Sequence, residues 1–224
     1  MQKLFSEGIE HTEFKDTKIG RIPKDWEVVH LSEICDITSS KRVHLADYKE
    51  MGIPFYRSKE IILKSKKSEV KKTLYISNEQ FNNLKDKYGI PQKNDILITA
   101  VGTIGVCYLV GEEEFYFKDG NLIWMRNFDS NTITEFLLYF FNSHRAQKEI
   151  EVISSGSTQN ALTIVKLNKL KIPIPLIQEQ QKIATILSES DAKIEKEQTQ
   201  KAHLEALKKG LMQQLLTGKK RVKV

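Results

Sequence analysis

Two short polar segments carry side chains that could read a nucleic acid. Thr38 to Arg42 combines three hydroxyl groups with two cations, and Ser154 to Asn160 combines hydroxyl and amide groups around a glycine. Such groups form the hydrogen bonds that recognise base edges and phosphates. The alternative for each segment is an ordinary solvent-exposed loop. The side chains that we expect to contact a nucleic acid are Ser39, Ser40, Lys41, Arg42, Ser157, Thr158 and Gln159.

A basic stretch lies between these segments, from Arg57 to Lys72. Seven basic and two acidic residues give it a local charge of +5, within a chain of net charge +6 and pI near 9.1. We expect phosphate contacts from Arg57, Lys59, Lys66 and Lys67, so that alanine at both Lys66 and Lys67 weakens binding to every sequence and flattens its salt dependence. A solvated lysine-rich face is the alternative.

The residues that do chemistry in enzymes show no persuasive arrangement. The chain lacks a GxxxxGK[ST] phosphate loop and the Asn-Pro-Pro-aromatic or Asp-Pro-Pro-aromatic motif of amino-methyltransferases. Glu69-Val70-Lys71 has the spacing of nuclease sites but no well-placed upstream Asp. Cys35 and Cys107 lack CxxC spacing and the five histidines are scattered, so we expect no metal site. The sequence therefore predicts a binding protein without a cofactor of its own.

The elements that should position the polar segments predict an α+β domain with mixed or antiparallel strands. Asp95 to Val101 and Val106 to Val110 are predicted strands around Gly102-Thr103-Ile104-Gly105. This turn resembles the GxxG clamp of some RNA-binding domains, although a hairpin turn is the more common interpretation, and Thr103 joins the expected nucleic-acid contacts. Capping-box spacing predicts helices from Ser77 to about Lys87 and from Thr132 to about Val152.

The C-terminal stretch from Leu176 to Gly218 is predicted to be one long helix. Between Gln178 and Thr217 it contains no Pro and a single Gly, Gly210. A stripe at 4-3 spacing is apolar at both ends and charged in the middle, which suits antiparallel pairing with a second copy about Thr199. The expected interface residues are Ile183, Leu187, Ile194, Glu197, Lys201, Leu204, Leu211 and Leu215.

In this pairing Glu197 faces Lys201 of the second copy, whereas parallel pairing would oppose like charges. The two apolar ends also meet, since Ile183 faces Leu215 and Leu187 faces Leu211. The alternative is a surface helix whose stripe packs on its own domain.

An ordered set of motifs resembles the DNA-specificity subunit of type I restriction-modification enzymes. The motifs span nearly the whole chain in the family's order, and together they are far more specific than any one of them. They are Ile19-Gly20-Arg21-Ile22-Pro23-Lys24-Asp25-Trp26, Asp95-Ile96-Leu97, Gly102-Thr103-Ile104-Gly105, Gly120-Asn121-Leu122, Gly156-Ser157-Thr158-Gln159, Leu170 to Pro175, Glu179-Gln180 with Ile183-Ala184, Ile186-Leu187-Ser188, Asp191, and Leu207 to Gly218.

The resemblance implies half of such a subunit, because family members usually carry two recognition domains separated by antiparallel helices. The expected organisation is an N-terminal segment resembling the end of a conserved helix (1–18), a DNA target-recognition domain (19–175), a dimerisation helix (176–218) and a basic tail (219–224). Two copies would form an antiparallel homodimer that reads a split double-stranded DNA target with inverted halves.

The resemblance also implies partners that perform the chemistry. Modification subunits would methylate adenine with S-adenosylmethionine, and a restriction subunit would use ATP and magnesium for translocation and cleavage, so these cofactors are expected on partner subunits only. No apolar run approaches the ~20 residues of a membrane span, so we expect a cytoplasmic protein. The alternatives are a coiled-coil dimeric regulator outside restriction-modification, and a stand-alone nuclease or methyltransferase.

Overall fold

The computed structural model describes residues 2–155 and 160–217. The chain divides into two compact units, Met1–Ala184 and Thr185–Val224. The first unit therefore contains the N-terminal segment and the beginning of the long helix, which extends the predicted recognition domain at both of its boundaries.

Four antiparallel strands form the central sheet, in the order β4-β10-β7-β8. Alternating and continuous apolar runs place most of their side chains in the core, and β7 is buried along its whole length. The strand bounds are Asp36–Thr38 for β4, Ile96–Thr99 for β7, Cys107–Leu109 for β8 and Leu122–Arg126 for β10.

A second sheet has three strands in the order β6-β5-β9, in which β5 pairs antiparallel with β6 and parallel with β9. Helix α3 begins where the sequence predicts, since the Ser77 hydroxyl accepts a hydrogen bond from the backbone N–H of Gln80 at 3.2 Å. The bounds are Ile53–Tyr56 for β5, Ser58–Ser65 for α2, Leu74–Ile76 for β6, Asn78–Tyr88 for α3 and Tyr116–Phe117 for β9.

Two small two-stranded sheets and several short helices also belong to the first unit. The two-stranded sheets are β1-β2 and β11-β3, both antiparallel, so β11 returns from far along the chain to pair with β3. The bounds are Lys3–Phe5 for η1, Phe14–Thr17 for β1, Gly20–Pro23 for β2, Glu27–His30 for β3, Leu31–Ile34 for α1, Leu45–Asp47 for η2 and Lys171–Ile174 for β11.

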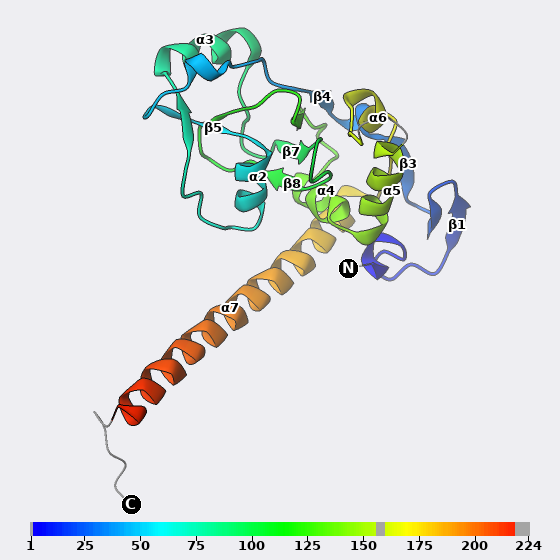
Figure 1. The fold of residues 1–224 in the computed structure, drawn as a ribbon. Helices are drawn as coiled ribbons and strands as arrows, with labels where there is room; N and C mark the ends of the chain where they lie inside the picture. Colours follow the sequence, from blue (N-terminus) through cyan, green and yellow to red (C-terminus); the bar gives the residue numbers. More distant parts are fainter. Residues whose placement is uncertain (1, 156–159, 218–224) are drawn as a thin grey trace, which may run out of the picture. The chain divides into compact units, whose positions relative to one another are not determined.

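Three helices follow the central sheet along the chain. The single helix predicted from Thr132 to Val152 is in fact two, because Ser143 caps a new helix by accepting a hydrogen bond from the N–H of Ala146 at 3.3 Å. The bounds are Thr134–Phe141 for α4, His144–Ser154 for α5 and Ile164–Asn168 for α6. Helix α4 packs beside β8, and α5 contacts α4 (Figure 1).

The predicted long helix is α7, an unbroken helix of 40 residues from Ile177 to Leu216 (Figure 1). Its first turns belong to the first unit, where Ile183 is fully buried and Ala184 nearly so. From Ser188 to Thr217 every residue is exposed. The α+β prediction with a long C-terminal helix is confirmed.

Candidate nucleic-acid interface

The strand order brings three connecting loops to one end of the central sheet. Because the strands are antiparallel, the ends of β4 and β7 lie beside the beginnings of β10 and β8, as the pairs Trp124↔Thr38, Leu122↔Thr99 and Ile98↔Cys107 record. The segments 39–42, 100–106 and 118–121 therefore leave the sheet together. We call these three segments, with the beginning of α2, the loop end of the domain.

Two hydrogen bonds attach the end of β5 and the beginning of α2 to the loop end. The Ser58 hydroxyl donates to the carbonyl of Asn121 at 3.2 Å, and the N–H of Lys118 donates to the carbonyl of Tyr56 at 2.8 Å. Lys59, one residue further along α2, is exposed there. The loop end thus joins two parts of the predicted nucleic-acid surface, the segment 38–42 and the first residues of the basic stretch.

Ser39 and Ser40 hold the first loop in place. Their hydroxyls donate to the carbonyls of Leu122 and Phe117 at 3.1 and 2.7 Å, and both side chains are half-buried. The N–H of Lys41 donates to the hydroxyl of Tyr116 at 2.9 Å. Both serines therefore position the loop, while each hydroxyl oxygen keeps lone pairs that can accept a hydrogen bond, and their role as base contacts stays a prediction.

The cations of the same loop remain accessible. The Lys41 ammonium lies 5.0 Å from the ring centre of Tyr88. The Arg42 Nε atom donates to Asp119 at 3.1 Å, but the Arg42 side chain is 70% exposed. Exposed cations at the tip of an anchored loop can contact phosphates with little loss of conformational entropy.

Arg57 caps α2 instead of presenting a free guanidinium. Its Nε and Nη2 atoms donate to Glu60 at 3.1 and 2.8 Å, and Glu60 is 2% exposed. Burial raises the pKa of Glu60, but the hydrogen bonds from Arg57 outweigh it, so the pKa lies below its usual value. The charge of Arg57 is therefore largely committed to a buried carboxylate.

Lys66 and Lys67 lie at the other end of α2. The helix is about 12 Å long, and at its far end the Lys64 ammonium pairs with Glu113 at 2.7 Å. Glu113 follows the end of β8 that is remote from the loop end. The basic stretch is thus divided between the two ends of α2, and the phosphate contacts of Lys66 and Lys67 stay a prediction.

The hairpin turn lies beside Ala161 and Leu162, the residues that follow the second polar segment. A bridge joins Val101 to Ala161, and the N–H of Leu162 donates to the carbonyl of Ala100 at 2.9 Å. Thr103 is exposed at the tip of this turn, whose Gly102 and Gly105 adopt φ values of +76° and +86°. The predicted contacts Ser157, Thr158 and Gln159 lie outside the described residues.

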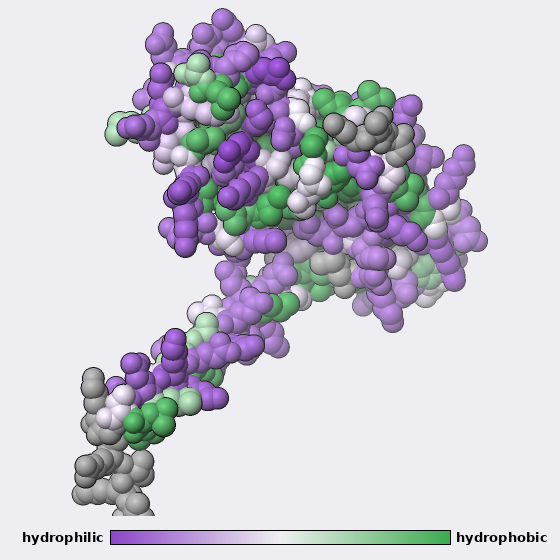
Figure 2. Space-filling view, in the orientation of Figure 1, coloured by the Kyte–Doolittle hydropathy of each residue, from purple (hydrophilic) through white to green (hydrophobic). Residues whose placement is uncertain are grey.

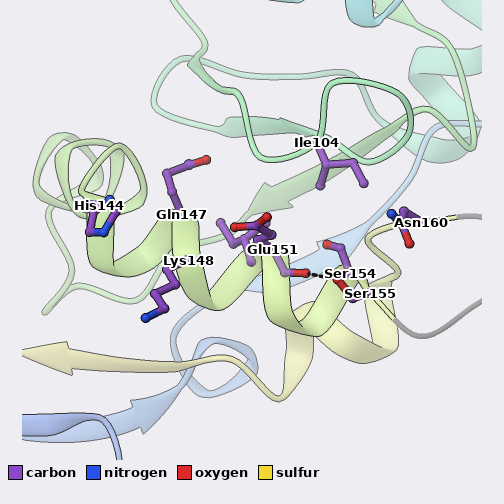
Figure 3. A pocket seen from close by; sticks show the side chains of 9 residues that line it. Ile104, His144, Gln147, Lys148, Glu151, Ser154, Ser155 and Asn160 are labelled. Atoms are coloured by element: carbon purple, nitrogen blue, oxygen red, sulfur yellow. Dashed lines mark hydrogen bonds between the residues drawn. The ribbon is translucent and has the colours of Figure 1, made fainter.

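A cavity of about 610 Å³ lies between the hairpin turn and α5 (Figure 3). Ile104 lines it from the turn, and polar side chains line it from α5 and from the end of the second polar segment. Gln147 supports the turn, because its Nε2 atom donates to the carbonyl of Gly105 at 2.9 Å. The polar residues of this cavity are His144, Gln147, Lys148, Glu151, Ser154, Ser155 and Asn160.

Sequence reasoning missed the α5 residues of this cavity. Gln147 and Glu151 lie on a helix that is predicted from capping-box and apolar spacing. Neither pattern indicates which loop a polar side chain of that helix will face. Ser154 and Asn160 were identified from the sequence, because they are the first and last residues of the second polar segment.

Within residues 2–155 and 160–217 no group of three His, Cys, Asp or Glu side chains could hold a metal ion. The same residues contain no helix long and apolar enough to cross a membrane. Cys35 and Cys107 are both buried free thiols. Burial raises the pKa of Cys35 to about 12 and the pKa of Cys107 further above its usual value.

Comparison with known proteins decides the family. Residues 23–206 match the model of the type I restriction modification DNA specificity domain. The chain belongs to this family. It is 33% identical over 229 residues to the type I restriction enzyme MjaVIII specificity subunit of Methanocaldococcus jannaschii, an alignment that covers all of this chain and 53% of the relative.

Solved structures of this family share the fold. The HsdS subunit of Thermoanaerobacter tengcongensis matches with a TM-score of 0.60 and 19% identity, covering 90% of this chain and 47% of that one. A chain of a type I restriction-modification system studied for its assembly matches with a TM-score of 0.63 and 22% identity, covering 85% of this chain and 44% of that one. The chain thus spans about half the length of its specificity-subunit relatives.

The family motif Glu179-Gln180 fastens α7 to the recognition domain. Glu179 accepts hydrogen bonds from the N–H of Ile9 and from Trp26 Nε1, both at 2.9 Å, and lies 2.9 Å from His11 Nε2. Gln180 is fully buried, and its amide donates to the carbonyls of Asn131 and Pro175. These two side chains therefore hold the N-terminal segment and the loops of the domain around the first turn of α7.

Burial along α7 corrects part of the predicted dimer interface. Ile183 is fully buried within the first unit, so it offers no surface to a second copy. The predicted interface residues that are exposed on α7 are Ile194, Glu197, Lys201, Leu204, Leu211 and Leu215.

Proposed function

We propose that this chain is a specificity subunit of a type I restriction-modification system that reads one half of a bipartite double-stranded DNA target. The observation that carries the proposal is the convergence of three polar loops and the beginning of α2 at one end of the sheet, in a member of the DNA specificity family. The comparisons give no support to a regulator outside restriction-modification.

Recognition at the loop end divides into two kinds of contact. Lys41, Arg42 and Lys59 contact phosphates and supply affinity that falls with salt. Thr103 and the polar side chains of the neighbouring cavity contact base edges, each good pair contributing about 1 to 3 kcal/mol of discrimination.

Two copies pair through α7 in antiparallel sense. The exposed part of the helix carries Ile194 and Leu204 on either side of Thr199, with Glu197 and Lys201 between them. About this centre Ile194 meets Leu204 of the second copy and Glu197 meets its Lys201. The pair fixes the distance between two inverted half-sites.

The chain itself performs no catalysis and holds no cofactor. Modification subunits methylate adenine with S-adenosylmethionine, and a restriction subunit uses ATP and magnesium to translocate and cleave DNA. The chain selects the site for both, in the cytoplasm.

Co-purification with a modification subunit tests this role directly. The tagged chain and the modification subunit of the same system are expressed together and purified on the chain's tag. The proposal predicts a stoichiometric complex that methylates DNA, while the lone chain with magnesium leaves DNA intact. Metal-dependent cleavage by the lone chain would contradict it and favour a stand-alone nuclease.

A further inference from the structure

A second cavity lies on another side of α5, away from the hairpin turn. This groove, of about 410 Å³, runs between α5, the turn joining β1 to β2 and the segment joining α6 to β11. Its apolar lining consists of Ile19, Val152, Ile153 and Leu170, and Val152 is 66% exposed. Figure 2 shows apolar side chains among hydrophilic ones over the part of the surface that carries α5 and β1.

Lysines line the same groove. They are Lys18, Lys148, Lys169 and Lys171. None of these four ammonium groups has an ion pair within residues 2–155 and 160–217, whereas Lys24, Lys64, Lys85 and Lys93 elsewhere on the surface each pair with a glutamate.

One acidic residue, Glu149, also lines the groove, so four lysines and one glutamate give a formal charge of +3. Burial raises the pKa of Glu149, an effect that the charge of Arg145 opposes. The groove therefore combines an apolar floor with unpaired positive charge. Exposed apolar surface with a polar rim is typical of sites where another protein docks.

The chemistry of the groove selects its occupant. A DNA backbone would use the lysines but would leave the four apolar side chains against charged phosphates. A protein segment with an aliphatic or aromatic anchor and flanking carboxylates satisfies both parts, because the anchor covers the floor while the carboxylates pair with the lysines. The volume suits a few side chains, not a folded domain.

We propose that this groove docks an acidic segment of the modification subunit that carries an apolar anchor. This inference rests on the proposed function, since it takes the modification subunit to be the partner. It adds a contact surface on the recognition domain that is distinct from the exposed part of α7 and meets the cavity beside the hairpin turn only at Lys148.

Two matched valine variants test the groove. Val152→Glu places a carboxylate in the groove, and Val165→Glu makes the same change at a valine that is 64% exposed on α6 and does not line the groove. Each full-length chain is titrated against the purified modification subunit by calorimetry, and a thermal unfolding curve checks that it is folded. We expect Val152→Glu to weaken the complex about tenfold or more and Val165→Glu to leave it within about twofold.

A double charge reversal, Lys18→Glu with Lys169→Glu, tests the electrostatic part. We expect it to weaken the same complex and to reduce its salt dependence, while binding of a random DNA duplex stays unchanged. Equal binding by both valine variants would overturn the inference. Loss of DNA affinity with an intact complex would also overturn it, because the groove would then be a nucleic-acid surface. A wild-type chain that forms no complex would instead refute the proposed partnership itself.

Discussion

Removing two lysines at the loop end should change how DNA binding depends on salt. Lys41 and Lys59 are exposed there, and no salt bridge involves either side chain within the described residues. If each neutralises one phosphate, the double variant Lys41→Ala with Lys59→Ala lowers the slope of log affinity against log salt by about 1.8, since each contact contributes about 0.9. When the salt concentration rises from about 50 to about 200 mM, the factor by which affinity falls is then about 12 times smaller for the variant than for the wild type.

Fluorescence anisotropy with a labelled duplex, repeated at several salt concentrations, measures this slope. The matched control is Lys66→Ala with Lys67→Ala, which removes the same charge from the far end of α2. We expect the control to keep the wild-type slope, in contrast to the expectation from sequence alone. Equal slopes for both double variants would refute the assignment of the DNA surface to the loop end.

Three further predictions concern the helix, its attachment and the thiols. Glu197→Lys should weaken the dimer about tenfold, because two ion pairs of a few tenths of a kcal/mol each become repulsions. Adding Lys201→Glu should restore the dimer. Sedimentation that finds a monomer at all concentrations would contradict the pairing. Glu179→Ala should lower the free energy of unfolding by about 3 to 5 kcal/mol, since it leaves buried donors without an acceptor, and a loss below about 1 kcal/mol in urea titrations would contradict this role. At pH 8 the thiols of Cys35 and Cys107 should react with a disulfide reagent only after unfolding, because burial raises both pKa values; rapid reaction of the native chain would show that they are accessible.

Local signals were read correctly where they decide structure by themselves. Ser77 begins α3 as predicted, and the apolar runs on either side of Gly102 form β7 and β8. The break between α4 and α5 was missed, although Ser143 is a typical capping residue, because the apolar spacing continues across it. The continuous apolar spacing led to the prediction of one helix, although the capping residue Ser143 marks the start of a second.

Local sequence patterns could not predict that the three segments of the loop end lie together. Their proximity depends on β10 lying between β4 and β7, a pairing between segments far apart in the chain. The same limit applies to the basic stretch, since the sequence gives its charge but not the direction of α2, which separates Lys66 and Lys67 from the loop end. The polar residues can be identified from the sequence, but the order of the strands decides which of them lie together.

The dimer stripe shows a different limit. A buried seam position looks the same in sequence whether it packs against its own domain or against a second chain. Ile183 packs within its own chain, as its complete burial records, whereas Ile194 and Leu204 are about half exposed. Burial in the folded chain was needed to separate the two.

Mapping of methylated adenines tests the central claim most directly. Genomic DNA from a host that expresses this chain with its modification subunit is sequenced by a method that detects the modified base. The account predicts one motif with two short halves that are inverted copies of each other, separated by a spacer of constant length. Two unrelated halves, or methylation at a single undivided motif, would contradict the claim that two copies of this domain each read half of the target.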